Sequence, residues 1–273
     1  MMTLVLGILG LTASAADLCY DYREINVDID LPTSWWGINE VGTVTGNFCP
    51  VANCDVFDVE GAILDLSDDD GNVITKVPNP LGAPGFVADF DVNRFGTSAG
   101  YTFSFTTGQG EAFTRTADGQ VTILPTFLPD TAQQIGTGIN NRGHVVGYSL
   151  LNDGSVVSWR YRPGHGFARI DLPSGDQFLV FDINNFGTVA GVATDADGVD
   201  RGVLRTRWGQ IRSFASPTGV LSVGGLNDFG QIVGAVFDPD ASASTPFVWS
   251  RWRGLRTANV PAQSALGDAS FEG

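Results

Sequence analysis

A nine-residue pattern constrains the fold of this chain more than any other feature. An aliphatic residue is followed by N-x-x-G-x-x-x-G, and the pattern occurs five times, beginning near residues 38, 92, 139, 183 and 226. Five copies with both glycines in place indicate a tandem structural repeat rather than a coincidence. The recurring residues are Asn39, Gly42, Gly46, Asn93, Gly96, Gly100, Asn140, Gly143, Gly147, Asn184, Gly187, Gly191, Asn227, Gly230 and Gly234.

Each recurring residue type has a structural role to which it is suited. An asparagine side chain bonds the backbone two residues further on and so forms a tight turn. The first glycine supplies a backbone position with a positive φ angle. The second glycine, inside a strand, allows a neighbouring backbone to approach closely. The motif therefore predicts a turn followed by a β-strand, and its recurring residues are of structural rather than catalytic types.

A second column of residues confirms the period of the repeat. Five glycine-led runs end in a proline at Pro78, Pro125, Pro173, Pro217 and Pro261. Apolar residues alternate with a period of two, which is typical of strands. We expect four strands in each unit of about 45 residues, the fourth running from the proline to the next asparagine.

Four short strands in tandem predict an all-β, propeller-like array of five repeats. Residues 25–36 resemble the third and fourth strands of a unit, and together with the C-terminal end they predict an incomplete sixth blade. Alternatively, residues 25–32 complete a five-bladed ring as an added strand. The alternative architecture is an open β-solenoid or stacked-sheet array, since repeated β-units can also cover their faces by linear stacking.

The first 16 residues carry no charge and contain a short apolar run. This run is far shorter than the roughly 20 residues that cross a bilayer. Ala13-Ser14-Ala15 fits an A-x-A cleavage signal. We therefore expect residues 1–15 to be a signal peptide and residues 16–273 to form one secreted (extracellular or periplasmic) domain. The alternative for the same residues is a buried first strand.

The formal net charge of −15 is concentrated in the first 150 residues. A chain this acidic repels phosphate backbones, which argues against nucleic acid as a partner. No later segment is apolar enough to predict a membrane span.

The asparagine–glycine unit, following an expected leader, resembles the bacterial HAF-repeat extracellular proteins. The resemblance covers residues 20–261. The His-Ala-Phe triplet that names the family is closest at Glu111-Ala112-Phe113, and Thr245-Pro246-Phe247 keeps only the phenylalanine. The resemblance implies a secreted repeat protein with no established activity.

Cysteines and acidic loops offer few candidates for a cofactor. Cys49 and Cys54 flank a four-residue loop, and an oxidising compartment favours a disulfide between them, with free thiols as the alternative. No cofactor is expected. Calcium is a weak candidate at two acidic hairpins, because oxygen ligands gather there without EF-hand spacing. These candidates are Asp65, Asp69, Asp195 and Asp197.

Histidine, tryptophan and arginine suggest structural roles first. His144 and His165 lack partners at zinc-ligand spacing and are expected in surface turns. We expect the tryptophans in strands to pack between blades rather than to form a carbohydrate-binding surface; these are Trp35, Trp36, Trp208, Trp249 and Trp252. The arginines of the last two units are expected to pair with aspartates rather than to form an anion-binding face; they are Arg205, Arg207, Arg212, Arg251, Arg253 and Arg256.

One segment, Gly96-Thr97-Ser98-Ala99-Gly100, also fits the G-x-S-x-G pattern of serine hydrolases. Its glycines are the two glycines of the second repeat, and the other repeats have valine or isoleucine in place of Ser98. No helical pattern follows, although a nucleophile elbow requires one. We therefore expect no catalytic role for Ser98.

These features favour a non-enzymatic binding protein whose partner is a surface glycan or a protein. The alternative is a secreted propeller hydrolase acting on glycans. It would depend on non-repeated carboxylates such as Glu40, Glu60 and Glu111, two of which would have to face one cleft.

Overall fold

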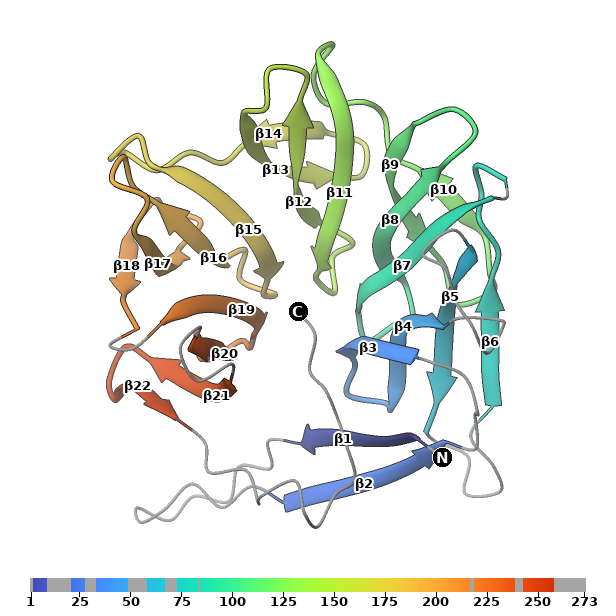
Figure 1. Ribbon diagram of the computed structural model, residues 1–273, viewed down its shortest axis with the longest axis horizontal. Helices are drawn as coiled ribbons and strands as arrows, with labels where there is room; N and C mark the ends of the chain where they lie inside the picture. Colours follow the sequence, from blue (N-terminus) through green and yellow to red (C-terminus); the bar gives the residue numbers. More distant parts are fainter. Residues whose placement is uncertain are drawn as a thin grey trace.

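The computed structural model describes residues 2–8, 21–27, 33–48, 58–66, 73–82, 84–216, 219–238 and 243–257. Within these ranges the chain forms 22 strands and no helix. Five four-stranded antiparallel meanders are arranged as blades around a central axis (Figure 1), and short parallel pairings between neighbouring blades join the first three into one twelve-stranded sheet. The fold is therefore a β-propeller.

The blades follow one another in chain order. Blade 1 consists of β3 (Thr33–Ile38), β4 (Thr43–Phe48), β5 (Asp58–Asp65) and β6 (Val73–Val77). Blade 2 consists of β7 (Gly85–Val92), β8 (Ser98–Ser104), β9 (Gly110–Arg115) and β10 (Val121–Ile123). Blade 3 consists of β11 (Thr131–Ile139), β12 (Val145–Leu151), β13 (Val156–Arg162) and β14 (Gly166–Arg169). Blade 4 consists of β15 (Gln177–Ile183), β16 (Val189–Thr194), β17 (Asp200–Arg205) and β18 (Ile211–Phe214), and blade 5 of β19 (Val220–Leu226), β20 (Ile232–Asp238), β21 (Ala243–Ser250) and β22 (Gly254–Thr257).

The blade starts one strand earlier than the sequence repeat suggested. The strand that ends at each asparagine, expected as the fourth of the preceding unit, pairs with the strand that follows the asparagine. It is the inner strand of its own blade, and the asparagine motif is the turn between the first two strands. The reason is local, because a tight turn joins two antiparallel strands more directly than a proline-containing connection does.

Each inner strand contains a register shift, or β-bulge, opposite the second glycine of the motif. A Cβ atom on any of these five glycines would lie between 1.9 and 2.1 Å from a carbonyl oxygen of the inner strand. No side chain fits there, so glycine is the residue that lets the two backbones approach. The first glycine of each motif has φ between 70 and 88°.

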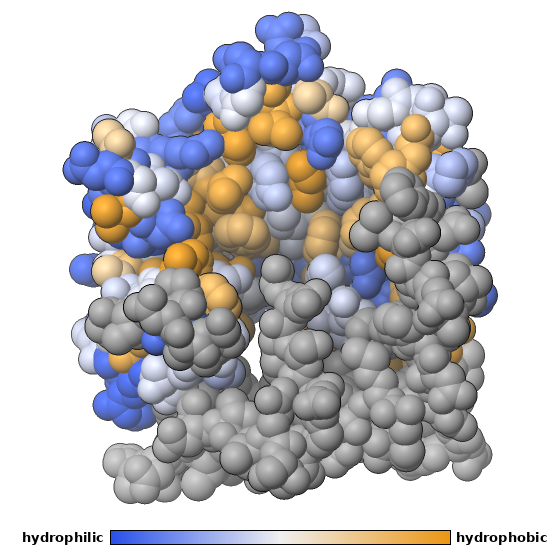
Figure 2. All heavy atoms as spheres, viewed as in Figure 1, coloured by the Kyte–Doolittle hydropathy of each residue, from blue (hydrophilic) through white to orange (hydrophobic). Residues whose placement is uncertain are grey.

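Four of the five hydrophobic core clusters of the described residues join residues of two neighbouring blades, and the fifth lies within blade 1. Trp159 of blade 3 is fully buried against Ala99 and Ala112 of blade 2. Leu204 of blade 4 packs in a cluster with Phe247 of blade 5. A blade is thus covered by its neighbours, as expected for stacked repeats. In Figure 2, hydrophilic residues gather toward the rim of the blades and hydrophobic residues toward the centre.

The N-terminal strands form a separate hairpin. Strand β1 (Met2–Ile8) pairs antiparallel with β2 (Asp21–Val27), and in Figure 1 the hairpin lies between blade 5 and blade 1. Residues 33–36, expected at the end of an extra unit, instead belong to β3, the inner strand of blade 1. Strand β1 overlaps the expected leader, and cleavage after Ala15 would remove the partner of β2.

Candidate functional site

The motif asparagines form a chain of hydrogen bonds that joins the blades. Each side-chain Nδ2 donates to the backbone oxygen of the next asparagine, at 2.9 Å from Asn39 to Asn93, 3.2 Å from Asn93 to Asn140, and 3.1 Å for each of the next two steps. Asn227 ends the series, and its Nδ2 donates to Gln231 within the same turn.

The other end of each asparagine amide closes its own turn. In blade 3, Oδ1 of Asn140 accepts hydrogen bonds from the backbone N–H groups of Arg142 and His144, at 3.0 and 3.1 Å. Every polar atom of the Asn140 side chain therefore has a backbone partner, and the side chain is buried. A buried amide whose oxygen and nitrogen both bond backbone groups serves to hold the structure.

Two aspartates form a second set of links between blades. Oδ2 of Asp91 in blade 2 accepts from the N–H of Ile139 in blade 3, and Oδ2 of Asp182 in blade 4 accepts from Leu226 in blade 5. Burial raises the pKa of both carboxyls, and the charge of Asp91 raises the pKa of Asp182 further. Both side chains hold backbone groups, so we assign them to the scaffold.

Blades 1, 3 and 5 have glycine where blades 2 and 4 have these aspartates. A Cβ on Gly138 would lie 2.8 Å from the Cα of Asp182. Glycine and aspartate therefore alternate at the position just before the aliphatic residue of each motif, which is occupied by Gly37, Asp91, Gly138, Asp182 and Gly225. This alternation is visible in the sequence but was not part of the predicted motif.

Ser98 has a structural partner that accounts for the hydroxyl in an otherwise aliphatic position. Its buried Oγ donates a short hydrogen bond to Asp89 on the adjacent inner strand. Asp89 stands where blade 4 has Val180, so blade 2 replaces an aliphatic pair with a polar one. Burial raises the pKa of Asp89 to about 6, and the hydrogen bond from Ser98 and the charge of Arg115 partly offset this. With both side chains buried, Ser98 is not exposed as a nucleophile.

One face of the ring carries large exposed apolar side chains. We call it the asparagine face, because it is formed by the five asparagine turns together with the turns between the third and fourth strands. These turns are neighbours: a Cβ on Gly96 would lie 2.9 Å from Ala117, and one on Gly187 would lie 3.6 Å from Arg207. The exposed apolar residues of this face are Val41, Phe95, Phe186, Trp208, Phe229 and Trp252.

The tryptophans were predicted to pack in the core between blades, and this prediction is wrong for Trp208 and Trp252. Trp208 is 76% exposed and Trp252 is 80% exposed, both in turns on the asparagine face. Trp249 is buried and Trp35 packs against Val44 and Leu64. Trp36, which lies 5.0 Å from the ring of Phe90, is partly exposed. Trp208 and Trp252 both lie in turns beyond the strand ends, where they are not covered by a neighbouring blade.

Among the described residues, no ion pair with an aspartate is seen for the arginines of the last two units, contrary to expectation. In the described part of the chain, the arginines in ion pairs are Arg169 and Arg201, and neither belongs to that set. Arg207 instead lies over the ring of Trp208, at 4.0 Å, and Arg251 over Trp252, at 3.9 Å. Arg94 and Phe95 form a third pair of this kind, at 5.0 Å. Three of the exposed rings thus have a guanidinium beside them.

The carboxylates proposed for hydrolysis lie in different parts of their blades. Glu40 is exposed in the asparagine turn of blade 1. Glu60 and Glu111 are near the starts of β5 and β9, at the opposite end of the blades from the asparagine turns. Glu60 lies 3.7 Å from Lys76, and burial raises the pKa of Glu111. The structure does not bring Glu40 together with the other two.

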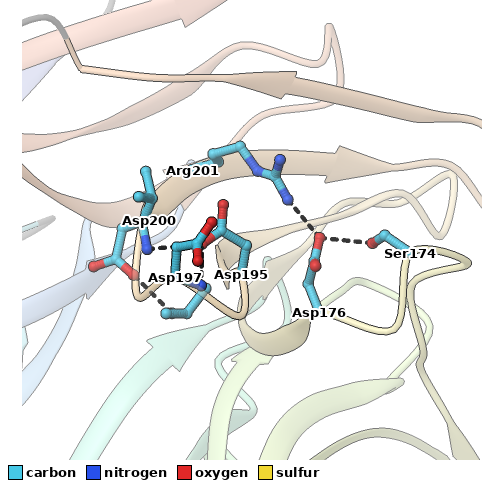
Figure 3. A network of polar contacts seen from close by, with 8 residues as sticks. Ser174, Asp176, Asp195, Asp197, Asp200 and Arg201 are labelled. Atoms are coloured by element: carbon cyan, nitrogen blue, oxygen red, sulfur yellow. Dashed lines mark hydrogen bonds and ion pairs between the residues drawn. The ribbon is translucent and has the colours of Figure 1, made fainter.

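The acidic loop between β16 and β17 is organised by hydrogen bonds within the protein (Figure 3). Oδ1 of Asp195 accepts from the N–H groups of Asp197 and Val199, at 3.0 and 2.9 Å. Asp176 forms an ion pair with Arg201. Among the described residues, no group of three histidine, cysteine or acidic side chains is placed to hold a metal ion.

Several candidates lie outside the described residues. These are Cys19, Cys49, Cys54 and Asp69. Asp65 is the last residue of β5 and interacts with at least one other group. His144 and His165 lie at turns of blade 3, on the asparagine face.

Comparison with known proteins supports the fold. A scan against protein-family models gives no match, and neither does a search of curated proteins. TolB from Agrobacterium tumefaciens is 12% identical over 83% of this chain and 80% of its own, with a TM-score of 0.61. Aleuria aurantia lectin, in complex with Fucα1-6GlcNAc, is 8% identical over 91% and 88%, with a TM-score of 0.53. Virginiamycin B lyase from Staphylococcus aureus is 13% identical over 89% of each chain, with a TM-score of 0.50.

These similarities establish the class of the protein, a β-propeller, and nothing finer, because every identity is low. The described ranges also contain no helix that is long and apolar enough to cross a membrane.

Proposed function

We propose that the protein is a non-enzymatic binding protein that recognises saccharides on its asparagine face. The observation that carries the proposal is the set of exposed rings on that face, three of which have an arginine beside them. Large exposed apolar side chains gathered on one face mark interaction surfaces. A sugar has apolar C–H faces and many hydroxyls, so a ring next to N–H donors matches both parts of it.

The distribution of the rings favours saccharides over a protein partner. They come from separate blades: Phe95 from blade 2, Phe186 and Trp208 from blade 4, and Phe229 and Trp252 from blade 5. A protein interface normally has one contiguous apolar core. Aromatic rings placed on different blades suit a glycan with repeated sugar units. Once one unit is bound, the next is held at a high effective concentration, so several weak contacts together give a higher affinity. The lectin complex above shows that a similar fold is compatible with a bound saccharide.

A glycan array probed with the full chain tests the proposal. We expect binding to a subset of oligosaccharides, lost in the Phe186→Ala/Trp208→Ala variant. Phe237→Ala is the matched control, because Phe237 is an exposed phenylalanine near the end of β20, away from the asparagine face. Absence of binding to any saccharide, or hydrolysis of the arrayed glycans, would overturn the proposal.

We further propose that the protein is exported. The support is the uncharged segment with its Ala-Ser-Ala signal, which would place the mature N-terminus at Ala16. Mass spectrometry of the protein from an exporting host tests this. A mature chain that still begins at residue 1 or 2 would contradict cleavage and would leave β1 paired with β2.

A further inference from the structure

Arginines from two blades meet at the boundary between blades 3 and 4. Residues two apart on a strand point to the same side of the sheet. Ser158 on β13 donates from Oγ to the backbone oxygen of Phe178 in blade 4, so Ser158, Arg160 and Arg162 lie on the side of blade 3 that faces blade 4. One terminal nitrogen of Arg160 lies 3.9 Å from the Cβ position of Gly187, in the asparagine turn of blade 4.

Blade 4 contributes Arg205 from the opposite direction. Its neighbour Leu204 packs with Leu221 and Phe247 of blade 5. Because adjacent residues on a strand alternate sides, Arg205 faces blade 3. Arg207, in the turn that follows, lies beside Gly187 as well. The four arginines thus come from both walls of the boundary.

The charges in this cluster act on one another rather than on acidic partners. Burial lowers the pKa of Arg160, and the charges of Arg162 and Arg205 lower it further. Burial also lowers the pKa of His144, with further contributions from Arg160 and Arg162. The Nε atoms of Arg160, Arg162 and Arg205 are buried and make no hydrogen bond within the described part of the chain.

The cluster is not part of the repeat. Register places Arg160 opposite Val146, and the equivalent residue is Thr114 in blade 2, Leu204 in blade 4 and Val248 in blade 5. The scaffold therefore does not require arginine at this position. Among the described residues, none of these guanidinium groups forms an ion pair, so the cluster is a local positive site in a chain with a net charge of −15 and is open to an anionic ligand.

We propose that the boundary between blades 3 and 4 is a subsite for an anionic sugar, one that carries a carboxylate or a sulfate group. Arg160, Arg162 and Arg205 bind the anion, since guanidinium groups donate paired hydrogen bonds to planar or tetrahedral oxyanions. Phe186 and Trp208, on the same turns as Gly187 and Arg207, offer apolar surface to the sugar ring. This inference rests on the proposed saccharide binding and names the class of ligand.

The test uses the full chain and three oligosaccharides of equal length: a galacturonic acid oligomer, a sulfated galactose oligomer and a neutral galactose oligomer. Calorimetric titration measures each affinity. We expect at least one acidic probe to bind at least about tenfold more tightly than the neutral one, a difference of about 1.4 kcal/mol. Whichever acidic probe binds more tightly identifies the anion. The Arg160→Gln/Arg162→Gln variant should lose this preference and keep the neutral affinity.

The matched control is Arg212→Gln/Arg256→Gln, which changes the net charge equally on the outer strands β18 and β22. It should change affinity by less than about twofold, because exposed distant charges are screened. Thermal unfolding checks each variant. If the glutamine variant unfolds, Arg160→Lys/Arg162→Lys keeps both charges, removes the guanidinium geometry and should still weaken acidic-probe binding several-fold.

The two proposals fail differently. If no probe binds and the array is also blank, saccharide binding itself is wrong. If the neutral probe binds as well as the acidic ones, or if the boundary variant and the control behave alike, the anionic subsite is wrong and saccharide binding stands.

Discussion

Each asparagine turn contains residues that are the same in every blade and a residue that varies from blade to blade. Inside each turn, the asparagine and the glycines recur in all five blades, and each has a backbone contact that defines its role. On the outside of the same turn, the residue just before the first glycine differs between repeats and is exposed in all five; these residues are Val41, Phe95, Arg142, Phe186 and Phe229. The residues that recur in every repeat therefore maintain the backbone geometry, and the residues that differ between repeats are the ones available to recognise a ligand.

The largest expected effect concerns the second glycine. In Gly147→Ala, the new Cβ would lie 1.9 Å from the carbonyl oxygen of Ile135, so the inner strand must move. We expect a loss of at least about 3 kcal/mol in the free energy of unfolding, or no folded protein. Gly154→Ala is the control, because Gly154 has φ of 83° but open space around it, and should cost about 1–2 kcal/mol. Equal losses in chemical denaturation would contradict the close-approach explanation.

The next largest effect is a pH dependence that originates inside blade 2. The pKa of Asp89 in the folded protein, about 6, exceeds the ordinary aspartate pKa of 3.8, so the folded state binds the proton more tightly. The free energy of unfolding should therefore fall as pH rises from about 4 to about 6 and then level off, by roughly 3 kcal/mol for this group. Asp89→Asn removes the titration and keeps the partner of Ser98. Denaturation at pH 4, 5, 6 and 7 measures the difference, and parallel curves for the two proteins would rule it out.

A smaller loss in the free energy of unfolding is expected when a motif asparagine is replaced. The loss should be larger for an asparagine that links two blades than for Asn227, which does not. Asn140→Ala leaves the N–H groups of Arg142 and His144 and the backbone oxygen of Asn184 without their side-chain partner, which should cost about 2 kcal/mol. Asn227→Ala should cost about 1 kcal/mol, because Asn227 closes its own turn and is less buried. A cost for Asn227 equal to that for Asn140 would show that the links between blades add nothing.

The smallest expected effect is on the outside of the turn. Phe229→Ala should change the free energy of unfolding by less than about 0.5 kcal/mol, since the side chain is 78% exposed. Phe113→Ala, at a fully buried position, should cost about 3–5 kcal/mol. Thermal and chemical unfolding compare the two. A large loss for Phe229 would mean that the exposed rings stabilise the fold, which would weaken the saccharide proposal.

Much of the fold was predictable because the repeat reports local geometry. The asparagine motif predicts a turn and a strand wherever it occurs, and the spacing of about 45 residues predicts four strands per unit. The blade boundary was not predictable from spacing, because a periodic pattern has no marked beginning. It depends on which strand pairs across the asparagine turn, as between Thr131–Ile139 and Val145–Leu151.

The candidate site was predictable only in part, for a related reason. Trp208 and Trp252 were expected in the core because aromatic residues usually are, but their exposure depends on whether the next blade covers the turn. Arg160 and Arg162 were not singled out, since nothing in the spacing shows that Arg205, more than 40 residues later, faces them. The one visible signal was Arg160, which stands where the other blades have Ile63, Thr114, Leu204 and Val248.

The amino-acid sequence alone determined the repeat, its strand content and the structural character of its asparagines and glycines, because these depend on contacts within one turn or one hairpin. It also placed Ser98 in a repeated strand position, and Ser98 is the first residue of β8. Only the tertiary structure decided that the buried partner of Ser98 is Asp89, that Asp91 and Asp182 link neighbouring blades, and that arginines from two blades share one boundary. Those facts depend on how blades face one another around the ring, and no spacing along the chain encodes that relation directly.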